Sequence, residues 1–217
     1  MRDTIQDAAI GVAVADSAAD LQAFLRPGSA AALWRRQMPR DVQGWLADLD
    51  TDLLPRARVV LSLDGVAAAL SDLCDRSALP EGPERAWLCA DIEELAQTFA
   101  ALMNTRYIRL RLDVVTTNAC RRFHIDALTA RLVCTYRGTG TQYGISPAGG
   151  EPTRVFTVQT GAPILLRGTL WPQTPPSGLL HRSPPIEGTG ETRLVLVLDP
   201  VSEAEAKADA EAKAHAE

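Results

Sequence analysis

The sequence is poor in several features that define common protein classes. Only 5% of its 217 residues are aromatic, and it has only three histidines. No run approaches the roughly 20 consecutive apolar residues that a transmembrane helix needs, so we expect no membrane span. The formal net charge of -5 leaves no overall cationic surface for phosphates, which argues against nucleic-acid partners and anionic membranes. The hydrophobic fraction of 46% is ordinary for a globular protein.

The cysteine pattern lacks the spacing of a disulfide scaffold or a CxxC zinc site. We also expect no secretory signal, because the short apolar stretch 8–15 follows Asp3 and Asp7 where a signal peptide carries positive charge. We therefore expect a cytoplasmic protein with reduced thiols. The cysteines are Cys74, Cys89, Cys120 and Cys134.

Residues 1–104 are expected to form a helical region that packs on the rest of the chain. Helical spacing of apolar residues, together with possible capping residues, predicts four helices. Their predicted starts are Asp16-Ser17, Asp41, Asp64 and Asp91.

The pattern changes at Thr105. Residues 107–116 alternate strictly between apolar and polar side chains, which predicts a half-buried strand. Six further short strand candidates follow, separated by turn clusters such as GTGTQYG (138–144) and without intervening helices. For residues 105–200 we predict an antiparallel double-stranded β-helix, or cupin-like jelly roll, so the whole is mainly β with N-terminal helices. The six candidates are RFHID, RLVCTYRG, TRVFTVQT, PILLRG, GLLHRS and TRLVLVLD.

Residues 201–217 form an alanine-rich, low-complexity tail. Its composition predicts a frayed or free helix, in which His215 has no function. The first two regions together are expected to make one structural domain.

The tripeptide His124-Ile125-Asp126 is the strongest functional pattern. In a strand the two polar side chains would share one face, where both can bind one ion. The other histidine outside the tail, His181, lies 55 residues after Asp126 in another predicted strand. Two histidines and one carboxylate make the facial triad of iron(II) oxygenases, which leaves coordination positions open.

Arg193 follows His181 by twelve residues and opens the apolar strand RLVLVL. Burying an arginine costs free energy unless the guanidinium pairs with an anion, and the planar guanidinium can form two parallel hydrogen bonds to a carboxylate. Two interpretations remain open: Arg193 binds a ligand carboxylate, or it forms a salt bridge with Glu191 or Asp199.

These motifs resemble those of the double-stranded β-helix dioxygenases that use iron(II) and 2-oxoglutarate. The segments ALWRRQMP, NACRRFHIDALTARLVCTYRGTGTQY and GLLHRSPPI more closely resemble a bacterial family known as domain of unknown function 1826. The dioxygenase resemblance implies His124, Asp126 and His181 as metal ligands and Arg193 as the clamp for 2-oxoglutarate. It further suggests a co-substrate hydroxyl from Thr135 or Tyr136. The family resemblance implies a link to metallochaperone GTPases of zinc supply.

The substrate side carries no recognisable signature, and neither substrate nor oligomeric state can be named. Polar residues near the motif are candidates, although each is more often structural: Arg131, Arg137, Gln142, Tyr143 and Arg182.

Cys120 leaves a second interpretation of the site open. If its thiolate joined the triad, the closed four-ligand set would suit zinc, in a non-enzymatic protein of metal homeostasis. Cys134 is expected to be a small buried residue. A scaffold that has lost its metal is a third possibility.

Overall fold

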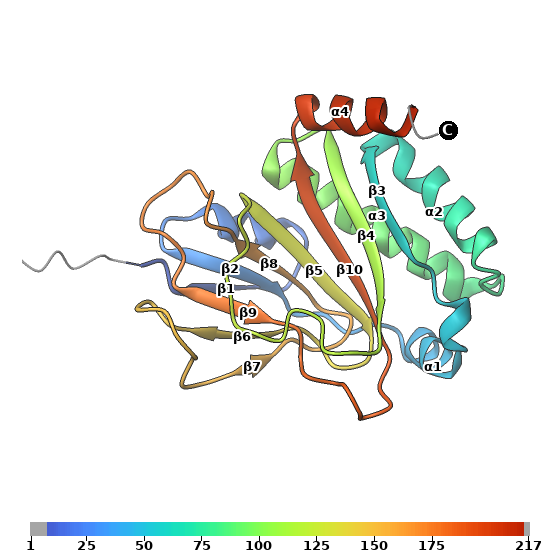
Figure 1. The fold of residues 1–217 in the computed structure, drawn as a ribbon, viewed down its shortest axis with the longest axis horizontal. Helices are drawn as coiled ribbons and strands as arrows, with labels where there is room; N and C mark the ends of the chain where they lie inside the picture. Colours follow the sequence, from blue (N-terminus) through green and yellow to red (C-terminus); the bar gives the residue numbers. More distant parts are fainter. Residues whose placement is uncertain (1–7, 215–217) are drawn as a thin grey trace, which may run out of the picture.

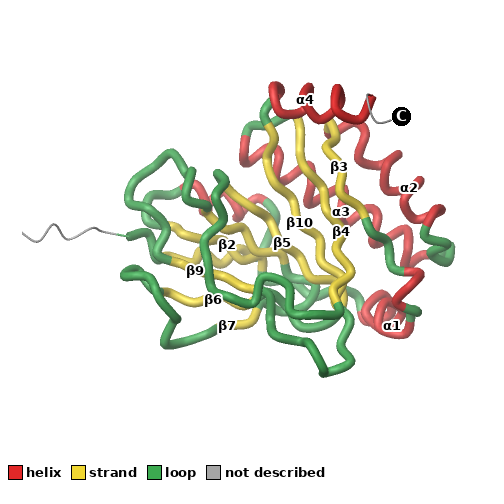
Figure 2. The backbone as a smooth tube through the Cα atoms, viewed as in Figure 1, coloured by secondary structure: helices red, strands yellow, loops and turns green. Residues whose placement is uncertain are grey.

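A computed structural model describes residues 8–214 and shows two β-sheets packed face to face, with helices on the outer face of the larger sheet (Figure 1). The larger sheet has seven strands in the order β1-β2-β8-β5-β10-β4-β3, and the smaller has three in the order β7-β6-β9. Figure 2 shows that long loops connect the strands at the ends of the sandwich. This is the jelly-roll fold predicted from the alternating strand pattern.

The strands of the larger sheet are β1 (Gly11–Ala15), β2 (Ser29–Trp34), β3 (Ala57–Ser62), β4 (Tyr107–Val115), β5 (Ala130–Arg137), β8 (Pro163–Arg167) and β10 (Arg193–Val201). Those of the smaller sheet are β6 (Gln142–Ile145), β7 (Phe156–Thr157) and β9 (Leu179–Arg182). The α-helices are α1 (Arg40–Asp48), α2 (Val66–Arg76), α3 (Pro83–Met103) and α4 (Glu203–Ala214). Three short 3₁₀ helices are η1 (Ala19–Leu25), η2 (Thr51–Leu53) and η3 (Leu63–Gly65).

Strand β10 shows how alternation divides the larger sheet into two faces. It pairs antiparallel with both β4 and β5. Leu194, Leu196 and Leu198 join a core that the helices complete with residues such as Ile92 and Phe99. The intervening Val195 and Val197 belong to a smaller apolar cluster between the two sheets. Because side chains alternate along a strand, one face serves the main core and the other faces the interior of the sandwich.

The prediction that the first hundred residues are helical was wrong for β1, β2 and β3. Strand β2 is rich in alanine, and Ala30, Ala31 and Ala32 are all fully buried. A strand buried on both faces has no apolar/polar alternation, so its sequence gives no period of two. These strands extend the larger sheet at both edges, so segments from residues 1–104 and 105–200 pair within one sheet.

Of the predicted helix starts, those at Asp64 and Asp91 were wrong, whereas α1 begins at Arg40, one residue before the predicted Asp41. Helix α3 begins at Pro83, which suits the first helical turn because proline lacks only an N–H that has no partner there. Asp91 therefore lies inside the helix, where its side chain is buried. Ser17 caps η1 as predicted, because its Oγ accepts from Asp20 N at 3.4 Å and its N–H donates to Asp20 Oδ2 at 3.1 Å. The helix after Asp64 has no side-chain hydrogen bond from its N-cap residue.

Two strand predictions in the sandwich need correction. The turn cluster 138–144 contains the start of β6, which the glycines concealed. The segment RFHID forms no continuous strand: only His124 makes a β-bridge, to His181 of β9. The isolated bridge nevertheless adds His124 to the edge of the smaller sheet, next to β9.

The tail forms helix α4 as predicted, and it lies beside β3 at one end of the larger sheet (Figure 1). His215 lies outside the described residues, as do Asp3 and Asp7. Within residues 8–214, no helix is both long and apolar enough to cross a membrane.

Candidate metal centre

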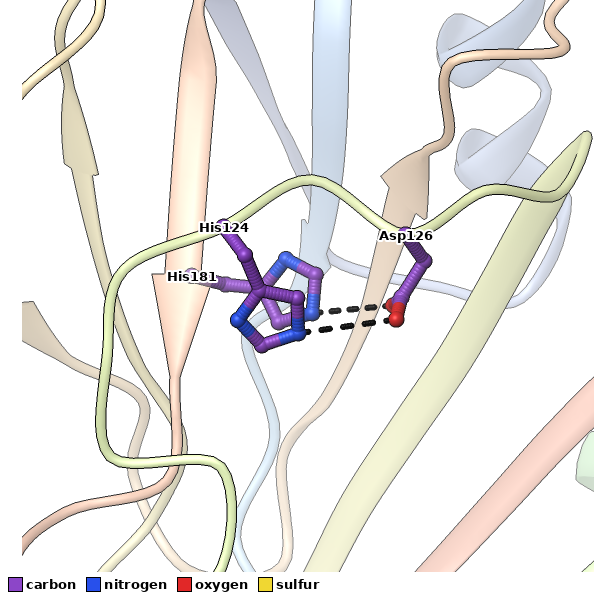
Figure 3. Close-up of side chains that lie close together, drawn as sticks. All are labelled: His124, Asp126 and His181. Carbon is purple, nitrogen blue, oxygen red and sulfur yellow. Dashed lines mark ion pairs between the residues drawn. The ribbon is translucent and has the colours of Figure 1, made fainter.

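His124, Asp126 and His181 come together at the edge of the sandwich interior. One ligand atom from each lies within 4.8 Å of the other two, which is compatible with binding a single ion. Figure 3 shows both imidazole rings directed at the carboxylate of Asp126. His124 Nε2 lies 3.5 Å from Asp126 Oδ1, and His181 Nε2 lies 3.0 Å from Oδ2.

The backbone fixes how the two histidines approach each other. His124 and His181 exchange N–H to carbonyl hydrogen bonds of 3.1 and 3.0 Å, so their side chains lie directly opposite. The ring of His124 is oriented by its Nδ1, which donates to the carbonyl of Arg122 at 2.9 Å. A carbonyl can only accept, so Nδ1 carries the proton and the neutral ring presents the lone pair of Nε2 to the site.

Asp126 is anionic and incompletely satisfied. Burial raises the pKa of its carboxyl, but contacts with His124 and His181 and the charge of Arg131 outweigh burial and hold that pKa well below its usual range. Arg131 Nη1 lies 2.8 Å from Asp126 Oδ2. Neither Arg131 nor His181 meets that buried oxygen with hydrogen-bond geometry, so it has no hydrogen-bond partner among the described residues.

The two histidines have different electrostatic surroundings. The contact with Asp126 raises the pKa of His124. Burial lowers the pKa of His181, whose side chain is only 9% exposed. A metal ion binds the neutral form of imidazole, so His181 is the histidine more readily available as a ligand near neutral pH.

Arg193 lines the same pocket as the two histidines and is almost completely buried, with 1% of its surface exposed. Its Nε donates to the carbonyl of Thr139 at 2.6 Å, and Nη2 donates to Thr135 Oγ1 at 3.3 Å. None of the ion pairs found within residues 8–214 involves Arg193, and Asp199 instead pairs with Arg131. Burial lowers the pKa of Arg193 to about 10. A buried cation that lacks a carboxylate partner is suited to binding an anionic ligand.

The two hydroxyl candidates lie on opposite faces of β5. Thr135 faces the sandwich interior, where it accepts the hydrogen bond from Arg193. Tyr136 points to the helices and donates to Asp91 Oδ2 at 2.6 Å. The structure therefore does not place Tyr136 in the pocket, and its hydroxyl is used in the core.

Cys120 lines the pocket with an exposed side chain, but the group of three possible ligands does not include it. Its carbonyl accepts a hydrogen bond from Ser183 N, two residues beyond His181. Cys134 is fully buried on the helix side, as expected for a small core residue.

The substrate candidates divide into those that line the pocket and those that do not. Arg131 and Arg182 line it, whereas Arg137, Gln142 and Tyr143 are not among its lining residues. Arg137 donates to the carbonyl of Leu49, and Gln142 accepts from Arg182 Nε.

Sequence reasoning missed Arg111 and Asp113, which also line the pocket. Their place in an alternating strand identified them as polar-face residues. No local motif indicated that this face of β4 points into the sandwich.

Comparison with known proteins supports the fold and identifies the family. Among proteins with curated descriptions, none matches. A rice dioxygenase for auxin oxidation has a similar structure, with a TM-score of 0.53 at 15% identity over 89% of this chain and 83% of the other. Dioxygenase for auxin oxidation 1 from Arabidopsis thaliana, solved with 2-oxoglutarate, gives a TM-score of 0.51 at 12% identity over 89% and 92% of the respective chains.

At these identities the two structures establish the shared jelly-roll fold. The family is shown by a different comparison, in which residues 15–199 match the model of a protein family described as of unknown function, DUF1826. Since the match includes strands of both sheets and the helices α1, α2 and α3, the chain belongs to the DUF1826 family.

Proposed function

We propose that this protein is an iron(II)- and 2-oxoglutarate-dependent oxygenase of the hydroxylase type. The observation that carries the proposal is that His124, His181 and Arg193 line one pocket, while Asp126 has a ligand atom within 4.8 Å of those of the two histidines. One of the structures with a similar fold was solved with 2-oxoglutarate, and this likeness supports the proposal.

The residues present fit such a metal. Two imidazole nitrogens and a carboxylate form the donor set, and the buried Oδ2 of Asp126 lies 3.0 Å from His181 Nε2 and 2.8 Å from Arg131 Nη1, without a well-aligned hydrogen bond to either. A three-residue set leaves coordination positions for co-substrate and oxygen. Iron(II) bound there would supply, with 2-oxoglutarate and oxygen, the oxidising chemistry for an otherwise unreactive C–H bond.

The chain itself would position the reactants. Arg193 would bind the far carboxylate of 2-oxoglutarate through its guanidinium, with Thr135 beside it to orient the fork. Arg131 lies between Asp126 and Asp199, pairing with each, and thereby limits rotation of the Asp126 side chain. Val133, Val195 and Val197 line the pocket and would exclude water from it.

The test is spectroscopic. Protein mixed anaerobically with iron(II) and 2-oxoglutarate should show a weak visible charge-transfer band, and His124→Ala should abolish it. Asp113→Asn is a matched control, because Asp113 lines the pocket without belonging to the triad. An intact protein that shows no band and instead retains stoichiometric zinc would contradict the proposal.

A zinc-binding, non-enzymatic protein is the second candidate, and the presence of Cys120 in the pocket lining favours it. That function requires the Cys120 thiolate to complete a closed site. Cys120→Ser should then weaken metal retention strongly, whereas the three-ligand site predicts little change. Zinc in an overexpressed sample does not decide alone, because zinc outcompetes iron(II) at most such sites. A link to a metallochaperone GTPase and a cytoplasmic location remain part of the proposal.

A further inference from the structure

An arginine-rich surface lies on the interior face of the larger sheet, beside the triad. The backbone register places Arg58 directly opposite Arg111 across strands β3 and β4. Arg109, two residues from Arg111, points to the same face, and all three line one hollow together with Arg131. This local charge contrasts with the acidic balance of the whole chain.

The acidic groups nearby do not satisfy all of these arginines. Both oxygens of Asp199 are bound by Arg131, whose Nε and Nη2 donate at 2.6 and 2.9 Å. Arg111 Nη2 lies 3.8 Å from Asp199, too far for a hydrogen bond. Glu205 lies on the far side of the same hollow, and Asp113 lines the pocket on the triad side.

Two members of this surface extend to the candidate metal centre: Arg131, which pairs with Asp126, and Arg111. Arg111 and Arg131 line both the arginine-rich hollow and the pocket of His124 and His181. The Arg111 side chain is 20% exposed, and its buried Nε has no hydrogen-bond partner among the described residues. An unsatisfied buried donor destabilises the fold, and like charges opposite each other in a sheet repel. An anion bound at the Arg111 guanidinium, which lines both the hollow and the pocket, would satisfy this donor and reduce the repulsion from Arg58.

We propose that Arg111 is a substrate-binding residue and that the substrate carries an anionic group, a carboxylate or a phosphate. This inference rests on the proposed function, because the substrate meant is the molecule oxidised at the triad. Arg193 is assigned to 2-oxoglutarate, so Arg111 provides a second, separate anion subsite in the same pocket. The Arg111 guanidinium would select substrates that carry a negative charge. The valines that line the same pocket would contact the apolar part of the substrate.

The experiment measures ligand binding by saturation-transfer NMR on metal-free protein saturated with 2-oxoglutarate. The probes are three matched pairs, benzoate and benzamide, phenylacetate and phenylacetamide, and hexanoate and hexanamide, with phenyl phosphate as a separate arm. We expect at least one carboxylate, or phenyl phosphate, to bind about tenfold or more tightly than the neutral probes. If the carboxylates bind more tightly than phenyl phosphate, the anionic group of the substrate is a carboxylate; if phenyl phosphate binds more tightly, it is a phosphate.

Variants then assign that preference to Arg111. Arg111→Gln should remove it and Arg111→Lys should keep part of it. Arg106→Gln is the matched control, because that exposed arginine pairs with Glu203 away from the pocket. Thermal melting of each variant checks that it is folded, and Arg111→Lys serves if Arg111→Gln is not.

Two results would overturn the inference: no anionic probe favoured over its neutral partner in the wild type, or an unchanged preference in folded Arg111→Gln and Arg111→Lys. The outcome is independent of iron. Absence of the visible band with iron(II) and 2-oxoglutarate would contradict the proposed function. A preference for anionic over neutral probes that depends on Arg111 would still establish the anion subsite.

Discussion

The two faces of the larger sheet handle buried charge differently. On the helix side, Arg36 donates to both oxygens of Asp91 at 2.6 and 2.7 Å, and Tyr136 donates a third hydrogen bond to the same carboxylate. On the interior side, Arg193 has no carboxylate partner, and Arg111 and Asp126 keep buried atoms without hydrogen bonds. The contrast is one of degree, because buried Arg167, which packs on Phe24 and Trp171 at the main core, also has two nitrogens without hydrogen bonds. A charge cluster that the protein completes supports the fold, whereas an incomplete cluster that lines a pocket points to a ligand.

The largest effect is expected from breaking the completed cluster. Asp91→Leu leaves Arg36 and Tyr136 buried without their partner, which should lower the free energy of unfolding by about 3–5 kcal/mol. Urea denaturation measures this loss. The double variant Arg36→Leu/Asp91→Leu should recover part of it, since it removes both charges. If the double variant lost as much stability as the two single variants Arg36→Leu and Asp91→Leu together, the two residues would not be coupled.

Removing the triad carboxylate tests the opposite face. With iron(II) added anaerobically at about 100 times its dissociation constant, the wild type should gain about 2.7 kcal/mol of stability. Asp126→Asn should lose most of this gain because the amide is neutral and a weaker ligand. Asp113→Asn, in the same pocket, should retain it. Differential scanning fluorimetry measures the stabilisation of each variant by iron(II). Equal stabilisation of Asp126→Asn and Asp113→Asn would contradict the assignment of Asp126 as a metal ligand.

Arg193 should separate stability from binding. Arg193→Met removes a buried cation without a carboxylate partner, so we expect a stability change within about 1 kcal/mol. The same variant should bind 2-oxoglutarate about 10- to 100-fold more weakly, since a charge-assisted bidentate contact is lost. Calorimetry of the two proteins gives the ratio. Unchanged affinity would assign the co-substrate carboxylate to another arginine.

The smallest effect concerns thiols on the helix side. Cys89 Sγ lies 3.6 Å from Cys74 Sγ, and the hydrogen bond from Cys74, with the charge of Arg85, lowers the pKa of Cys89 to about 7. Alkylation of Cys89 should therefore speed up about tenfold between pH 6 and pH 8. Burial raises the pKa of Cys134 to about 12, so that thiol should stay unmodified. Peptide mass spectrometry distinguishes them, and Cys89→Ser is the control.

Local patterns predicted the parts of the fold that have a clear period. Strands β4 and β10 alternate strictly, and the dense turn clusters between short strands identified the jelly roll. Strands β1, β2 and β6 were missed, because alanine and glycine carry little of the side-chain pattern on which such predictions depend. Strand β3, with the sequence ARVVLS, was missed because it is short and its apolar residues do not alternate strictly.

The candidate site shows the same division. His124, Asp126, His181 and Arg193 were found from sequence, because their residue types are rare and their spacing fits one chemistry. Arg111 and the role of Asp91 were not found, and Arg131 was only one of several polar candidates, since each depends on partners 45 to 88 residues away. The sequence by itself determined which side chains are candidates to bind a metal and a carboxylate. Only the tertiary structure decided which charges are satisfied, because hydrogen bonds and burial depend on how distant strands pack together.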